Sequence, residues 1–306
     1  MSGQCRDGVT PSGGGDAVDR VLDIYRREKL VFGKRYFPHY FRKKSPPFHV
    51  NLIRASSENL NTAIHAPRGS SKSTVVAFLD AIHGICMKSE HFIVIVQNTY
   101  AKASASLNNI KFEVRYNAEL KADFGVEMKM KDAEGDTIFT HPDGFSCRVL
   151  CKGADQLGSI RGERFGAYRP TLILVDDLED DEMVRNPERR IELEKQFNEV
   201  LNYAGEAGET RIVVIGTVLH DDALMAKLLS PERYKRFKKL FFDVITDDDE
   251  SLWPEKWSRQ DLRAMEAEDP VGFAKEMRGN PSSGSLETIR REDFRYWRET
   301  GGVLSC

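Results

Sequence analysis

One segment of the chain combines small residues, a lysine and hydroxyl side chains as phosphate binding requires. It runs from Ala66 to Thr74 (APRGSSKST), between a short apolar run and a stretch of helical periodicity. Small residues let backbone N–H groups approach phosphate oxygens, and the helix dipole favours an anion there. We expect Lys72 to reach the β- and γ-phosphates and Ser73 to bind Mg²⁺. Because Ala66 and Ser71 replace the glycines of G-x-x-x-x-G-K-[ST], a polar turn with an incidental lysine is the alternative.

A second segment places two carboxylates directly after an apolar run. The run 171–175 is followed by Asp176 and Asp177, which is typical of a Walker B element. We expect Asp176 to hold Mg²⁺ and a second carboxylate to polarise the attacking water. Asp177 and Glu179 are equal candidates for this catalytic base, Asp180 is a further one, and the sequence does not decide among them. The alternative is a strand end followed by a solvated acidic loop.

A third polar position closes the apolar run 211–218. Thr217 lies near the end of this run. A polar side chain there can contact the γ-phosphate and the catalytic water at the same time, and so report whether ATP is intact. The alternative is a threonine that caps the helix expected from about Asp221. Taken together, the three segments predict hydrolysis of ATP with Mg²⁺.

Short apolar runs alternate with longer helical stretches from about residue 60 onward. The runs are 61–66, 91–97, 171–177 and 211–218, and the helix candidates are 72–87, 99–118, 187–203 and 221–229. Such runs suit strands buried on both faces, so we predict a three-layer α/β fold of the P-loop NTPase class with a mainly parallel central sheet. The strand 91–97, between the two motifs in sequence, favours the RecA-like branch (also called ASCE). A Pro-Asp-Gly turn within 137–152 predicts a hairpin.

The chain divides into four parts by composition and pattern. We expect a disordered tail at 1–16, an N-terminal helical segment at 17–58 whose first helix covers about 17–28, the ATPase core at 59–246 and a C-terminal linker or lid at 247–306. The N- and C-terminal parts are expected to be small appendages of the core.

Composition restricts the possible partners. A formal net charge of -3 excludes a uniformly basic surface, so any nucleic-acid contact needs a local patch. Two basic runs are candidates, and the alternative for each is a solvated face. They comprise Lys34, Arg35, Arg42, Lys43 and Lys44 in the first run, and Arg233, Lys235, Arg236, Lys238 and Lys239 in the second. No apolar segment has the ~18 residues of a membrane span. The five cysteines lack the spacing of a zinc site, so we expect a cytosolic protein with free thiols.

Together the motifs resemble the large terminase subunits of tailed bacteriophages over roughly residues 30–298. The resemblance rests on APRGSSKST, the IRG element 160–162, TLILVDD, DDLEDDEMVRNPERR, GTVLH, SLWPEKWS and FAKEMRGNP, in that family's order. It implies an ATP-hydrolysing motor that moves double-stranded DNA into a procapsid, with ATP and Mg²⁺ as cofactors. It also implies a homo-oligomeric ring, a portal protein and a small terminase subunit as partners, no membrane, and the host cell cytoplasm as location.

The same resemblance implies roles for single residues. Nucleotide phosphate would be bound by Ala66, Pro67, Arg68, Gly69, Ser70, Ser71, Lys72, Ser73 and Thr74. Arg68 would sense phosphate, and Thr217, with His220, would couple hydrolysis to movement. Arg161 would act in trans as an arginine finger, with an ordinary surface ion pair as the alternative. The adenine pocket would use Phe37, Phe41, Phe48 and His49, whose alternative is a place in the core.

Members of that family usually carry a second, nuclease domain. The sequence ends at Cys306, which leaves no room for it, so we expect no nuclease activity from these residues and either a fragment or a truncated product. Two other function classes stay open. One is another RecA-like nucleic-acid-stimulated ATPase or helicase, and the other is a non-hydrolysing nucleotide-binding scaffold.

Overall fold

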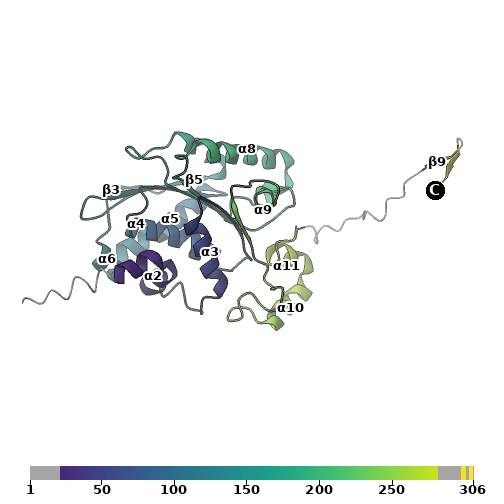
Figure 1. Cartoon of the computed structure of the whole chain (residues 1–306), viewed down its shortest axis with the longest axis horizontal. Coiled ribbons are helices and arrows are strands. Elements are labelled where there is room, and N and C mark those ends of the chain that lie inside the picture. Colours follow the sequence, from purple (N-terminus) through teal and green to yellow (C-terminus); the bar gives the residue numbers. More distant parts are fainter. Residues whose placement is uncertain (1–20, 282–297, 301–302, 306) are drawn as a thin grey trace, which may run out of the picture.

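The protein is built on an eight-stranded sheet with helices on both faces (Figure 1). A computed structural model of the chain describes residues 21–281, 298–300 and 303–305. The tail expected at 1–16, the start of the helix expected at 17–28 and much of the end of the 247–306 segment lie outside the described residues. Residues 21–27 are helical.

The sheet has the strand order β3-β4-β5-β2-β6-β7-β1-β8. The strands are β1 Asn61–His65, β2 Phe92–Gln97, β3 Glu127–Asp132, β4 Asp136–Thr140, β5 Ser146–Gly153, β6 Leu172–Asp176, β7 Arg211–Gly216 and β8 Lys238–Phe241. From β5 to β8 all neighbours pair in parallel, whereas β4 is antiparallel to both β3 and β5. The four apolar runs are therefore strands, and the predicted hairpin is β4–β5. A separate pair, β9 Arg298–Thr300 and β10 Val303–Ser305, is antiparallel.

Two helical layers cover the sheet. The first contains α2 Lys29–Tyr36, α3 Pro47–Glu58, the π-helical turn η1 Ser73–Phe78 continued by α4 Leu79–Cys86, α5 Tyr100–Tyr116 and α6 Ala118–Phe124. The second contains η2 Ala154–Gly162, α7 Asp181–Arg185, α8 Pro187–Tyr203 and α9 Leu224–Leu229. Strand residues alternate between the layers: Ile93 and Ile95 pack on the first, and Val94 and Val96 on the second. The three-layer prediction is confirmed.

A helical pair follows β8. It consists of α10 Arg259–Glu268 and α11 Pro270–Glu276, and Figure 1 shows it beside the end of the molecule opposite β3. Val244, Leu262, Phe273 and Met277 form a small apolar cluster of their own there. The pair therefore has its own local core next to the main sheet.

The strand order brings the three sequence motifs together. Strand β7 lies between β1 and β6, and β2 lies on the far side of β6. His65 pairs with Gly216, and Asp176 pairs with Ile215, so β1, β7 and β6 end side by side. Because parallel strands present their carboxyl ends at one edge, the residues that follow these strands share a crevice. Strand β8 was not predicted, since its sequence KKLF has too few apolar residues to stand out.

Candidate nucleotide-binding site

The loop after β1 has the backbone conformation of an anion site. Gly69 has φ +76° and Ser71 has φ +64°, whereas Lys72 is right-handed helical. Such alternation turns successive N–H groups toward one point, and no side chain caps the helix start at Lys72. Ser71 stands where the general pattern has glycine, and a left-handed serine costs roughly 1–2 kcal/mol. The loop keeps a strained conformation that suits phosphate binding.

Lys72 is a buried cation whose polar partners within the chain lie at long distances. Its side chain is 7% exposed, and its Nζ lies 3.4 Å from Thr217 Oγ1 and 3.6 Å from Asp177 Oδ1. The second distance is too long for a good hydrogen bond, and the Asp177 side chain is half exposed. A buried charge needs close partners to offset its desolvation. Phosphate oxygens at the adjacent loop would supply them, so Lys72 fits the role predicted from the sequence.

Ser73 and Asp176 offer a pair of oxygen ligands. Ser73 Oγ donates a hydrogen bond to Asp176 Oδ1 at 3.0 Å, and Gln97 Nε2 donates to Asp176 Oδ2 at 3.1 Å. Burial, assisted by the charge of Asp177, raises the pKa of Asp176 to about 7. A cation at this point would favour the carboxylate form again. Hydroxyl and carboxylate oxygens suit Mg²⁺, which takes one or two protein ligands and completes its shell with phosphate and water.

No alternative metal centre competes with this pair in the part of the chain that the structure describes. No group of three or more His, Cys, Asp or Glu side chains there could hold a metal ion. Cys86, Cys147 and Cys151 are buried and free. The Ser73–Asp176 pair is therefore the place where the described residues fit a magnesium ion that arrives with a nucleotide.

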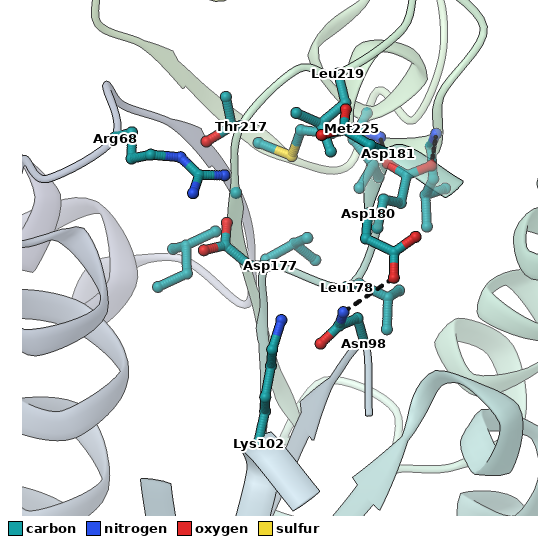
Figure 2. Close-up of a pocket in the computed structure, with 16 residues that line it drawn as sticks. Arg68, Asn98, Lys102, Asp177, Leu178, Asp180, Asp181, Thr217, Leu219 and Met225 are labelled. Atoms are coloured by element: carbon teal, nitrogen blue, oxygen red, sulfur yellow. Dashed lines mark hydrogen bonds between the residues drawn. The ribbon is translucent and has the colours of Figure 1, made fainter. Parts of the chain in front are cut away.

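The two candidate bases have different surroundings. Asp177 has φ +45°, is 54% exposed, and faces a cavity of about 170 Å³ (Figure 2). Glu179 also lines this cavity, but its carboxylate accepts the backbone N–H groups of Leu224 at 2.8 Å and Met225 at 2.9 Å. Both of its oxygens thus hold the start of α9, and burial raises the pKa of Glu179. A water beside the phosphates has an available acceptor in Asp177, so the geometry favours Asp177 as the base.

Arg68 and Thr217 line the same cavity as Asp177 (Figure 2). The Arg68 guanidinium is also bound to α11, because Nε donates to Glu276 Oε2 at 2.7 Å and the Arg68 N–H donates to Glu276 O at 2.9 Å. Thr217 is buried at the end of β7. His220 lies farther along, where its Nδ1 accepts the N–H of Asp222 at 2.9 Å. Arg68 and Thr217 are placed to contact a phosphate group in the cavity.

Arg161 lies outside this cavity. It belongs to η2, where NH1 forms an ion pair with Glu199 of α8 at 3.2 Å and Nε donates to Gly158 O at 3.0 Å. Its side chain is 47% exposed. Within one chain it is thus a surface ion pair, which was the alternative to the finger, and only a neighbouring subunit could receive it as a finger.

The aromatic stretch before the loop is mostly core. Phe37 and Phe48 are buried in the main cluster, and Phe41 packs against that cluster. His49 is also buried, and its Nε2 lies 2.9 Å from Ser70 O. Since the carbonyl can only accept, Nε2 carries the proton, and burial lowers the pKa of His49 to about 4. His49 therefore contacts the phosphate loop through Ser70 as a neutral ring, and Phe37, Phe48 and His49 take the alternative place in the core.

Three further residues join the site without having been predicted. Gln97 ends β2 and holds Asp176, and its one sequence signal is a polar side chain that closes an apolar strand. Glu276 and Lys256 reach the loop from about 200 residues away, and Lys256 Nζ donates to Gly69 O. Contacts across such separations leave no local pattern, so sequence reasoning could not have found these two.

Several members of the two basic runs form ion pairs or hydrogen bonds within the chain. In the first run, Arg35 pairs with Glu119, and Lys43 donates to Glu255 O at 2.9 Å. In the second run, Arg233 pairs with Glu194.

Among the described helices, none is long and apolar enough to cross a bilayer.

The strand order, the loop and the strand-end carboxylate define a P-loop NTPase fold. No family model and no curated protein sequence matches the chain. The structure is similar to that of a large terminase from a thermophilic bacteriophage, with 12% identity, a TM-score of 0.51 and coverage of 78% of this chain and 53% of that one. The large terminase ATPase domain of a Thermus phage has 15% identity, a TM-score of 0.48 and coverage of 78% and 99%.

A third solved structure, the Phi-28 gp11 DNA packaging motor, has 12% identity, a TM-score of 0.41 and coverage of 80% and 68%. At 12% sequence identity, the similarity to the large terminase of the thermophilic bacteriophage shows a shared fold and no more. The chain spans about half the length of that terminase.

Proposed function

We propose that the chain is the ATPase domain of a DNA-packaging motor of the large terminase kind. One observation carries the proposal: four side chains converge around a loop shaped for phosphate. They come from the carboxyl-terminal sides of β1, β6 and β7, and they are Lys72, Ser73, Asp176 and Thr217. That arrangement supports binding and hydrolysis of ATP. The order of the sequence motifs supports the packaging role.

The residues divide the work of hydrolysis among them. The N–H groups of the loop and Lys72 bind the phosphates, while Ser73 and Asp176 would hold Mg²⁺, whose charge would offset that of the transferring phosphoryl group. Asp177 accepts a proton from the attacking water. Arg68 and Thr217 contact the γ-phosphate from the cavity side, and Thr217 links its state to β7 and the loop beyond. His49 holds the loop in shape through Ser70 O.

The partners follow from the same proposal. We propose a ring of identical subunits, in which Arg161 of one chain would enter the site of the next. Double-stranded DNA is the substrate that moves, through contacts with the backbone phosphates that need no sequence recognition. A portal protein and a small terminase subunit are the further partners, and the host cytoplasm is the location. The segment 247–306 serves as a linker or lid in this proposal.

ATP turnover of the purified chain tests the proposal. The unmodified chain should hydrolyse ATP with Mg²⁺. The turnover rate of Lys72→Ala should be lower by at least about 100-fold, because the charge that develops on the phosphates in the transition state is no longer stabilised by the Lys72 ammonium group. A matched control is Lys238→Ala in β8, which should keep the rate. Equal turnover by Lys72→Ala would contradict the proposal, and nucleotide binding without turnover would favour a scaffold.

A second experiment separates packaging from strand unwinding. Adding procapsids that carry their portal, with double-stranded DNA, should accelerate turnover and protect the DNA from added nuclease. Acceleration by single-stranded DNA alone would instead identify a helicase-like ATPase.

A further inference from the structure

A second cavity adjoins the phosphate loop, and neither Ser73 nor Asp176 lines it. It has a volume of about 530 Å³, between Arg68 and Gly69 of the loop and the helical pair α10–α11. Ligand pockets in proteins usually measure roughly 300–1,000 Å³. Its lining is mainly apolar and includes Trp257, Met265, Phe273 and Met277. The phosphate-binding loop thus continues directly into an apolar cavity.

Trp257 forms the wall of this cavity nearest the loop. A Cβ atom added at Gly69 would lie 3.4 Å from Trp257 Cζ2, so the ring packs directly on the loop backbone. Lys256 Nζ donates to Gly69 O and lies 4.8 Å from the Trp257 ring centroid. Among the described residues, Lys256 forms no ion pair with a carboxylate. An aromatic face and a cation therefore stand together at the junction of loop and cavity.

The direction of a bound nucleotide is set by the sheet order. The γ-phosphate end must face Asp176, the last residue of β6, and Thr217, which follows β7. Strand β8 lies on the other side of β1, and α10–α11 come after β8 in the chain. A nucleotide extended along the loop away from β6 therefore carries its base toward the α10–α11 side. That is the side on which the apolar cavity lies.

We propose that this cavity binds the purine base of the nucleotide and that Trp257 is the surface on which the base stacks. The inference rests on the proposed function, since it gives a binding site to the base of the same ATP molecule whose phosphates bind at the loop. It moves the base pocket from the buried aromatic residues Phe37 and Phe48 to the segment that follows β8. Base binding would then join α10–α11 to the phosphate loop through the ligand itself.

Calorimetric titration with two probes tests the assignment. ATP carries the base, whereas inorganic tripolyphosphate carries the phosphates alone, and both are titrated with Mg²⁺ into the full chain. Trp257→Ala should weaken ATP binding by about tenfold or more, because stacking of a base on an aromatic side chain contributes that much. The same variant should change tripolyphosphate binding by less than about twofold. Phe112→Ala, an exposed aromatic change on α5, is the control and should alter neither.

A fluorescence measurement supports the test if Trp257→Ala folds poorly. ADP should change the tryptophan emission of the unmodified chain, tripolyphosphate should not, and the ADP effect should be lost in Trp257→Phe. Equal weakening of both probes by Trp257→Ala, or an unchanged ADP response in Trp257→Phe, would overturn the base pocket. Failure of the unmodified chain to bind either probe would overturn the proposed function as well.

Discussion

The buried carboxylate of Asp176 makes a prediction about stability that is independent of turnover. Its side chain lies among Ser73, Gln97 and Lys72 at the end of β6, and burial raises its pKa from 3.8 to about 7. A raised pKa means that the folded chain holds this proton more tightly than the unfolded chain does. Stability is therefore lost as the pH rises from about 4 to about 7.

The size of the effect follows from the pKa difference. Each pH unit of difference corresponds to about 1.4 kcal/mol, so the ionised carboxylate costs the fold up to about 4 kcal/mol above pH 7 when no cation is bound. Asp176→Asn removes this cost while keeping the shape of the side chain. The variant should exceed the unmodified chain in free energy of unfolding by about 1–4 kcal/mol at pH 8, with the gain fading toward pH 4. It should also lose stabilisation by Mg²⁺ with ATP.

Thermal unfolding scans between pH 4 and pH 8, with and without Mg²⁺ and ATP, measure both parts. Asp247→Asn, in the exposed acidic loop, is the control and should leave the pH profile unchanged. A lower melting temperature for Asp176→Asn at pH 8, or a difference that does not vary with pH, would refute the reasoning. Retained stabilisation by Mg²⁺ with ATP would refute the metal assignment.

Three further predictions concern turnover. Gln97→Leu should raise the Mg²⁺ concentration for half-maximal turnover by about 10–100-fold, because the partner of Asp176 is lost; an unchanged magnesium titration would exclude this role. Asp177→Asn should lose at least about 100-fold in kcat while Glu179→Gln keeps most of it, and the reverse ranking would make Glu179 the base. Arg161→Ala should lose most turnover but keep ATP binding, and mixing it with Asp176→Asn chains should restore some activity; absence of rescue between assembled variants would exclude action in trans.

The sequence predicted the parts of the fold whose signals are local. The strands β2, β6 and β7 are nearly continuous apolar runs because both faces of the sheet are covered, so each stood out in the chain. Only Ala63 and Ile64 are apolar in β1, which stood out because it directly precedes the phosphate loop. The helix predicted at 187–203 has those bounds in the structure, where the Asn186 side chain caps it and Pro187 is its first residue. Strand β8 was missed because basic residues fill half of its four positions.

The candidate site was predictable only where residues are neighbours in the chain. Asp176 ends β6, Lys72 and Ser73 close the loop that begins where β1 ends, and strand ends meet at one edge of a parallel sheet. The choice between Asp177 and Glu179 could not be made, because it depends on contacts that Glu179 makes with α9, some 45 residues away. The aromatic residues near Phe48 suggested a base pocket, but the packing of α3 against the main core uses them instead.

The account rests on a triphosphate bound at Lys72 whose magnesium is held by Asp176. A crystal structure of the chain with Mg²⁺ and a slowly hydrolysed ATP analogue tests this most directly. We expect Lys72 Nζ against the β- and γ-phosphates, and the Ser73 and Asp176 oxygens, now 3.0 Å apart, both facing the metal ion. A nucleotide bound elsewhere, or a metal ion that touches neither oxygen, would contradict it.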